Sequence, residues 1–294
     1  MVVSGSQQAL DLATRVLLDV GSSAWIEEPG YWLVHRVLQA RGCRAMPVPV
    51  DDEGLDVSAG VKLARKARGV FVAPSHQYPL GVTMSASRRL QLLEWTRSAG
   101  AWIIEDDYDS EYRYDTMPIA SLQGLDTNGR VIYIGSFSKV MFPSLRLGYL
   151  VIPPDLVERF AAMRETMDIC PADIAQAVTA EFIREGHFAR HIRRMRPIYA
   201  ERRRVLVAEI QQQFGDRATI IGDEAGMHLA VVLRRLQNDA KIAAKAAKES
   251  LWLSALSGLY LGSVRQQGFI LGFGNTNLSQ IAPAVRQLKK LLAA

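Results

Sequence analysis

Short apolar runs alternate with helical patterns over the first two-thirds of the chain. The apolar runs predict strands at 24–26, 45–50, 69–73, 102–104, 131–134 and 148–152. Between several of these runs, apolar side chains recur at helical spacing, most clearly over 8–18 and 87–98. Strands that alternate with helices form βαβ units around a mostly parallel sheet. The pattern therefore predicts an α/β fold for this part of the chain.

From about residue 174 the pattern changes. A long helical stretch runs to about Phe214, and we expect Pro197 to interrupt or kink it. Strand-like segments follow at 228–233 and 269–273, and a helical pattern over 278–292 closes the chain. This order predicts a large α/β domain over residues 1–187 and a smaller C-terminal α+β domain over 188–294.

Length and composition describe an ordinary globular chain. The 294 residues, 49% of them hydrophobic, provide a core for one large domain or two domains. No apolar run approaches the roughly 18 residues that a membrane helix needs, and the N-terminal segment lacks the pattern of a signal peptide. Cys43 and Cys170 are too few for a disulfide framework or a four-thiolate zinc site. These features favour a cytoplasmic protein without a membrane partner or a metal.

The net charge of +5 comes from one segment. Eight arginines and two glutamates lie between Arg184 and Arg204, so the rest of the chain is near neutral. A basic helical face is usually a solvated face. We therefore do not expect these residues to bind DNA directly.

Two polar features stand where predicted elements begin or end. Ser4-Gly5-Ser6-Gln7 opens a predicted helix, whose free N–H groups and positive dipole end suit a phosphate, although a plain serine cap explains the turn as well. The acidic run 105–109 follows a buried strand, where open parallel sheets bind ligands. It could hold a metal, fix a cationic ring nitrogen or form a solvated loop. A metal would call for more histidines than His76, which alone lies near such a strand end.

Two further turns also follow strands. Gly135-Ser136-Phe137-Ser138-Lys139 places a lysine among small hydroxyl residues, which suits an amine that forms a Schiff base. Arg146 follows seven residues later and could clamp a phosphate or lie on the surface at a strand start. The turn over 74–81 is rigid because of its two prolines, which do not explain why His76, Gln77 and Tyr78 stand together.

In this order, the phosphate turn, the strand-end turn, the acid, the lysine and the arginine resemble the fold-type-I pyridoxal-phosphate enzymes of the aspartate aminotransferase superfamily. Four finer motifs resemble the aminotransferase-like (class I/II) domain of the MocR subgroup of GntR-family transcriptional regulators. These motifs are Glu27-Glu28-Pro29-Gly30-Tyr31, 74–79, 105–114 and 191–196. The resemblance covers essentially the whole chain and implies that family's two-domain fold.

The resemblance assigns a role to each candidate residue. Lys139 would form an aldimine with pyridoxal 5′-phosphate, Asp106 would pair with its pyridine nitrogen, and Tyr108 would bond its phenolic oxygen. Tyr31 would stack on the ring or pack in the core, and His76 or Gln77 is a further candidate for cofactor binding. The phosphate would be held by Gly5, Ser6, Gln7, Ser136 and Arg146.

Two departures from the family pattern bear on activity. Members commonly carry an arginine for the substrate carboxylate before a Leu-Gly-Phe segment, but Ile270 precedes Leu271-Gly272-Phe273, and Arg265 is out of register. The family's winged helix-turn-helix and the first part of its aminotransferase domain would precede Met1, so the resemblance implies an N-terminally truncated chain.

The resulting hypothesis is an effector-sensing domain that binds a small-molecule amine or amino acid as an external aldimine. An active aminotransferase is the alternative, and a cofactor-free remnant is a third reading. The resemblance also implies a homodimer, with DNA contacted only through the N-terminal winged helix-turn-helix.

Overall fold

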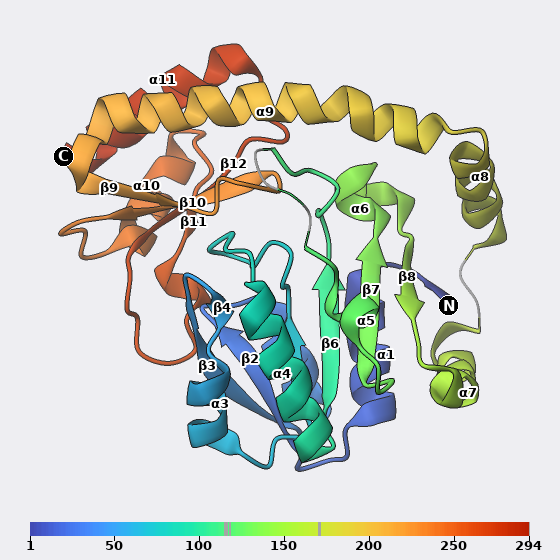
Figure 1. Cartoon of the computed structure of the whole chain (residues 1–294). Coiled ribbons are helices and arrows are strands. Elements are labelled where there is room, and N and C mark those ends of the chain that lie inside the picture. Colours follow the sequence, from blue (N-terminus) through green and yellow to red (C-terminus); the bar gives the residue numbers. More distant parts are fainter. Residues whose placement is uncertain (115–116, 118, 170–171, 294) are drawn as a thin grey trace.

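The computed structural model describes residues 1–114, 117, 119–169 and 172–293. The chain forms an eight-stranded sheet and a four-stranded sheet, each covered by helices (Figure 1). Cys170 lies outside the described residues, whereas Cys43 is buried and is not part of a disulfide.

The larger sheet has the strand order β1-β8-β7-β6-β5-β2-β3-β4. Its central strands are parallel, and β1, β4 and β8 pair antiparallel with their neighbours, which confirms the predicted mostly parallel sheet. All six predicted strands are present, within three residues of the expected ends. Together with the short strands β1 and β4, which were not predicted, the sheet consists of β1 (Val2–Val3), β2 (Ser23–Glu28), β3 (Arg44–Asp51), β4 (Gly54–Leu55), β5 (Gly69–Val72), β6 (Trp102–Asp107), β7 (Val131–Ser136) and β8 (Gly148–Val151).

Helices cover both faces of this sheet, which explains why its strands read as apolar runs without alternation. Ile104 and Ile132 pack in the cluster under α1 (Ser6–Leu17), α2 (Trp32–Ala40) and α7 (Val157–Asp168). Their neighbours Ile103 and Val131 pack in the opposite cluster, under α3 (Val57–Ala64), α4 (Ala86–Ala99) and α5 (Leu122–Leu125). Each strand therefore buries alternate side chains against a different helical layer.

The smaller sheet is antiparallel, with the order β11-β12-β10-β9. It contains the predicted strands β10 (His228–Leu233) and β12 (Gly268–Gly272), together with β9 (Ala218–Ile221) and β11 (Ser254–Ala255). The helices α10 (Asp239–Lys248) and α11 (Leu278–Ala293) belong to the same region. The predicted smaller α+β region is thus confirmed. We call the region from β9 through α11 the second unit.

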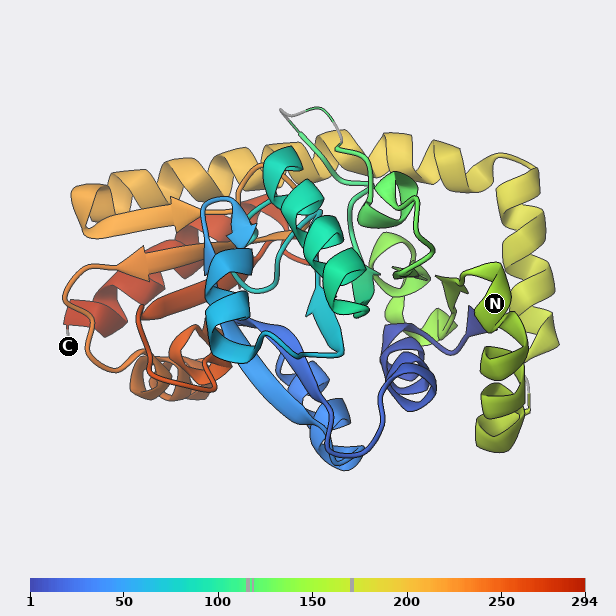
Figure 2. The same cartoon turned by 60° about the horizontal axis from the view of Figure 1, so that its bottom comes forward.

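A long helix, α9 (His187–Phe214), runs from α8 (Asp173–Arg184) across the molecule to the smaller sheet, as Figure 2 shows. The expected interruption at Pro197 is wrong, because α9 continues through it, whereas the alternative of a kink stays a prediction. Buried Ile192 and Tyr199 on either side anchor the helix to the core, so packing outweighs the hydrogen bond that proline removes.

The remaining elements are short. They comprise α6 (Phe137–Val140) and the 3₁₀ turns η1 (Pro143–Leu145), η2 (Pro154–Leu156), η3 (Gly215–Arg217) and η4 (Ser257–Leu259). Within the described part of the chain, we find no helix that is both long and apolar enough to cross a membrane.

Candidate functional site

The carboxyl ends of β2, β5, β6 and β7 meet at one edge of the larger sheet, which faces the second unit (Figure 1). Since β8 is antiparallel to β7, its first residue lies at the same edge. The predicted site residues stand on these strand ends, on the loops that follow them or at the start of α1. The topology therefore explains how residues distant in sequence reach one edge.

Three glycines bring the start of α1 against β7 and β8. A Cβ atom on Gly148 would lie 2.9 Å from the Gly135 carbonyl oxygen and 3.0 Å from Gly5 Cα, so only glycine allows this approach. A Cβ atom on Gly5, which has a φ of +116°, would lie 3.3 Å from Arg146 Nη2. The Arg146 guanidinium thus lies over the first turn of α1.

The first turn of α1 presents free donors beside this guanidinium. Gly5 is the N-cap and brings no side chain to bond the first N–H groups, which have no intrahelical acceptor. Gln7 Oε1 is buried without a partner. Ser136 caps α6 by accepting a hydrogen bond from the Ser138 N–H at 3.2 Å. A guanidinium, a helix N-terminus and a hydroxyl at one point form a donor set for a phosphate.

The acidic run at the end of β6 divides into partnered and unpartnered carboxyls. Glu105 accepts the N–H groups of Leu122 and Gln123, both at 2.9 Å. Asp107 accepts the hydroxyl groups of Ser110 at 2.7 Å and Tyr133 at 2.8 Å. These two acids therefore have structural roles.

Asp106 differs from both neighbours because its buried Oδ1 has no partner. Burial raises the pKa of Asp106 to about 7, and the nearby Asp107 and Asp109 carboxyls contribute to the rise. A buried carboxyl of this kind is stabilised by a proton or by a cation placed against it. Asp106 is therefore suited to receive a positively charged ring nitrogen.

A cavity extends from Asp106 to Glu27 and Tyr31. Burial raises the pKa of Glu27 to about 8, and Glu27 Oε1 is buried without a partner. The Tyr31 ring stands edge-on to Tyr78, with their centroids 6.0 Å apart. Tyr31 thus borders the space next to Asp106, which leaves both expected roles, stacking and core packing, open to it.

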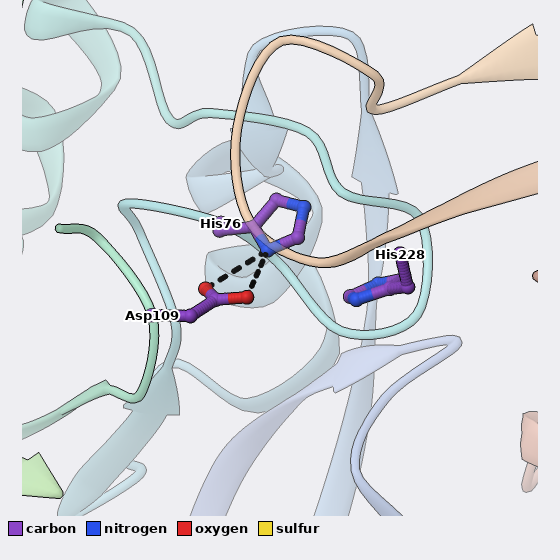
Figure 3. Close-up of side chains that lie close together, drawn as sticks. All are labelled: His76, Asp109 and His228. Atoms are coloured by element: carbon purple, nitrogen blue, oxygen red, sulfur yellow. Dashed lines mark hydrogen bonds and ion pairs between the residues drawn. The ribbon is translucent and has the colours of Figure 1, made fainter. Parts of the chain in front are cut away.

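The buried His76 and Asp109 and the half-buried Tyr108 form a hydrogen-bonded group. His76 Nδ1 lies 3.0 and 3.1 Å from the two carboxylate oxygens of Asp109. The Tyr108 hydroxyl donates to the His76 carbonyl oxygen at 2.6 Å and lies 3.3 Å from His76 Nδ1. The ring of His228, from β10, points toward the His76–Asp109 pair (Figure 3), and its centroid is 4.5 Å from that of His76.

The same group brings together ligand types that metals favour, because His76, Asp109 and His228 place one ligand atom each within 4.8 Å of the others. The main chain of Gly226 nevertheless fills the space beside His76 and Asp109. A Cβ atom on Gly226 would lie 2.2 Å from His76 Nδ1 and 2.5 Å from Asp109 Oδ2. We therefore interpret the group as a hydrogen-bonded one.

Gln77 has a structural role. Its amide nitrogen donates to the carbonyl oxygens of Pro29 at 2.9 Å and Tyr78 at 2.7 Å, and its oxygen accepts the Leu80 N–H at 2.9 Å. These bonds join the turn after β2 to the turn after β5.

Lys139 lies in α6, just beyond the end of β7, with an exposed side chain. Among the described residues, no hydrogen bond or ion pair holds its amine. Burial and the neighbouring His76 lower the pKa of His228 to about 3, and the positive charge of Lys139 contributes to this decrease. The amine is therefore free to reach a ligand at this edge.

Sequence reasoning missed Glu27, Asp109 and His228 as site residues. Glu27 and Asp109 belong to motifs described above, but adjacent acids in a run cannot be told apart without their partners. His228 starts a strand of the second unit and carries no local signal. Ile270 is buried against Leu80 and Leu256, whereas exposed Arg265 borders a separate cavity beside Glu28 and Asp51.

Solved aminotransferases share this fold. The kynurenine aminotransferase of Pyrococcus horikoshii, solved in complex with PMP, is similar over 100% of this chain and 74% of its own, with a TM-score of 0.93 and 28% identity. The family model "Aminotransferase class I and II" matches residues 1–270. The chain belongs to the aminotransferase class I and II family.

Two curated relatives are regulators. The probable rhizopine catabolism regulatory protein MocR of Rhizobium meliloti is 40% identical over 100% of this chain and 59% of its own length. The HTH-type pyridoxine biosynthesis transcriptional regulator PdxR of Corynebacterium glutamicum is 31% identical over 94% of this chain and 59% of its own length. The chain thus spans about three-fifths of the regulators that it matches.

Proposed function

We propose that this chain holds pyridoxal 5′-phosphate and works as the effector-sensing domain of a GntR-family regulator of the MocR type. The observation that carries the proposal is the buried, unpartnered Oδ1 of Asp106 at the end of β6. A protonated pyridine nitrogen would supply the partner that this oxygen lacks. The family membership and the regulator relatives support the same assignment.

Each end of the cofactor has matching residues in this chain. The first turn of α1, Ser136 and Arg146 would bind the phosphate, and Lys139 would hold the carbonyl end covalently. Tyr108 would bond the phenolic oxygen, and Tyr31 would cover a ring face. When bound, pyridoxal phosphate serves as an electron sink for reactions at the carbon that bears the substrate's amine. The freed amine of Lys139 would then carry a proton at that carbon.

Absorbance spectroscopy with added pyridoxal phosphate tests this proposal. We expect a visible band that borohydride bleaches, together with a covalent mass increase after reduction. Lys139→Ala should lack both the band and the mass increase while keeping the wild-type far-UV circular dichroism spectrum. A folded wild-type protein without the band would show that the site does not hold the cofactor.

The sensing role is favoured over catalysis by Ile270. Its side chain is buried against Leu80 and Leu256, where common family members offer an arginine to the substrate carboxylate. A regulator needs the effector to bind, but it does not need turnover.

We further propose that the boundary between the large and the small domain lies between residues 187 and 188. Contact with DNA would be made only by a region outside residues 1–294.

An active aminotransferase is the second candidate, favoured by the TM-score of 0.93 to a solved aminotransferase. The two candidates share the binding of an amine, so only multiple turnover separates them. The loaded protein should be given an amino donor and a keto acid acceptor, with product measured against protein concentration. Product limited to one equivalent supports sensing, whereas continued turnover supports the enzyme.

The proposal includes a homodimer in the cytoplasm that binds a small-molecule amine or amino acid. An apolar face on α8 supports the dimer, because Ile174 and Val178 are 82% and 63% exposed at helical spacing. Two cysteines in the chain, too few for a disulfide framework, support the compartment.

A further inference from the structure

The proposed cofactor-contacting residue Tyr108 has only one hydroxyl proton, and its direction decides what the residue can do. In the structure this proton goes to the His76 carbonyl oxygen at 2.6 Å. To bond an ionised oxygen of a ligand, the hydroxyl must turn away from that carbonyl, and no other acceptor beside it can then compete for its proton. His76 Nδ1, at 3.3 Å from the Tyr108 oxygen, is such an acceptor whenever it carries no hydrogen.

Asp109 fixes which nitrogen of His76 carries a proton. Both oxygens of Asp109 lie within 3.1 Å of His76 Nδ1, and a carboxylate only accepts, so the hydrogen sits on Nδ1. The two side chains are 1% and 2% exposed, which shields the pair from water. Because Asp109 keeps the hydrogen on Nδ1, this nitrogen cannot accept the Tyr108 hydroxyl proton, which is left for a ligand oxygen.

The second unit holds this pair in place. Asp109 Oδ2 also accepts the Met227 N–H at 3.3 Å, and the main chain of Gly226 lies directly against the His76 ring. The titratable groups around Tyr108 are Asp106, Asp109, Glu27 and Tyr78. His76 faces His228 from the other side.

We propose that His76 and Asp109 are positioning residues that orient the Tyr108 hydroxyl toward the cofactor's phenolic oxygen. The inference rests on the proposed function, because it concerns the same site. Neither residue needs to touch the reacting atoms. Asp109 sets the tautomer of His76, and His76 sets the direction of the Tyr108 hydroxyl.

The test is a double-mutant cycle read from the pH midpoint of the visible band of the loaded protein. Tyr108→Phe removes a donor that stabilises the ionised oxygen, so it should raise the midpoint by roughly one pH unit. Asp109→Asn acts in two ways. Loss of its negative charge lowers the midpoint directly, whereas a misdirected Tyr108 hydroxyl raises it.

The two effects separate in the Tyr108→Phe background, where only the direct effect can act. We expect Asp109→Asn to shift the midpoint upward relative to its shift in that background, by about half a pH unit or more. Asp107→Asn is the matched control. The Asp107 carboxyl lies at the same strand end, but it bonds Ser110 and Tyr133. Its removal should therefore shift the pH midpoint of the band equally in both backgrounds.

Equal shifts for Asp109→Asn in both backgrounds would overturn the inference while leaving the proposed function intact. A wild-type protein without the band would refute the proposed function and this inference with it. If Asp109→Asn fails to fold, His76→Gln replaces it in the same cycle with the same expected coupling. Thermal unfolding midpoints of all variants separate a loss of stability from the spectral effect.

Discussion

Asp106 combines a proposed binding role with a stability cost. Its buried Oδ1 lacks a partner, and the pKa of Asp106 is raised to about 7 by burial. The usual pKa of aspartate in an unfolded chain is about 4, so the folded chain binds this proton more tightly. Protonation therefore stabilises the fold, and the free energy of unfolding falls as the pH rises from about 4 to about 7.

Asp106→Asn should separate binding from stability. Without an ionisable group, the cofactor-free variant should be more stable than the wild type at pH 8, by roughly 1–3 kcal/mol, and this difference should vanish near pH 4. The loaded variant should lose cofactor about tenfold more readily. Thermal unfolding between pH 4 and pH 8 tests the first part, and equal pH profiles for both proteins would contradict it.

Gly5 provides a second residue-level prediction. Gly5 and Gly21 both have positive φ angles, but an added Cβ atom meets Arg146 only at Gly5, with nothing within 4 Å at Gly21. Gly5→Ala and Gly21→Ala should each lower the free energy of unfolding by about 1 kcal/mol. Only Gly5→Ala should also weaken binding of pyridoxal phosphate, measured by titration. Equal affinities would argue against a phosphate site at this turn.

At the scale of elements, Glu28 links β2 to the segment after η4. Its carboxylate accepts the Gly262 N–H at 2.7 Å and the Leu261 N–H at 3.0 Å. This bond crosses from the larger sheet to the second unit, close to the edge that carries the candidate site. The contact thus ties the second unit to the end of a central strand.

Glu28→Gln should loosen that tie, because an amide oxygen accepts more weakly than a carboxylate. We expect the amides of Leu261 and Gly262 to exchange with deuterium about tenfold faster. Glu53→Gln is the control, since Glu53 is exposed and its carboxylate bonds the Arg88 side chain, with no bond to Leu261 or Gly262. Unchanged exchange in Glu28→Gln would show that other contacts hold the segment.

Most elements could be predicted from the sequence, because strands buried on both faces leave long apolar runs. The helix over 8–18 and the last helix, α11, could be predicted because their apolar positions recur at helical spacing. The interruption expected at Pro197 is absent, since the local pattern does not show how far the burial of Ile192 and Tyr199 outweighs the cost of the proline. Among the site residues, Asp106 could be singled out only through a family resemblance.

At the scale of the whole molecule, α9 is 28 residues long, which corresponds to about 42 Å. Its arginines explain the basic segment. Arg196 donates to the Glu111 carbonyl oxygen at 2.8 Å, Arg203 lies 3.3 Å from Asp223, and Arg202 bonds the Gly274 carbonyl. Several of these charges therefore hold α9 to both parts of the fold, so part of the face expected to be solvated is structural.

The exposed face of α8 leads to a prediction about assembly. Ile174→Glu with Val178→Glu should convert a dimer to a monomer, because buried like charges oppose association. The fold should change in stability by less than about 0.5 kcal/mol, since both side chains are exposed. Light scattering measures the mass. Leu63→Glu, at an exposed position of α3, is the control, and a monomeric wild type would refute the dimer.

The buried Oδ1 of Asp106 lacks a partner until a ligand supplies one, so ligand binding should affect how much of this protein a cell contains. A ligand that occupies the folded chain at a hundred times its Kd adds about 2.7 kcal/mol to stability by mass action. Proteases act on the opened chain, so a shortage of the ligand shortens the lifetime of the polypeptide. The supply of the proposed cofactor would then govern abundance as well as occupancy, and the chain would respond to scarcity by disappearing.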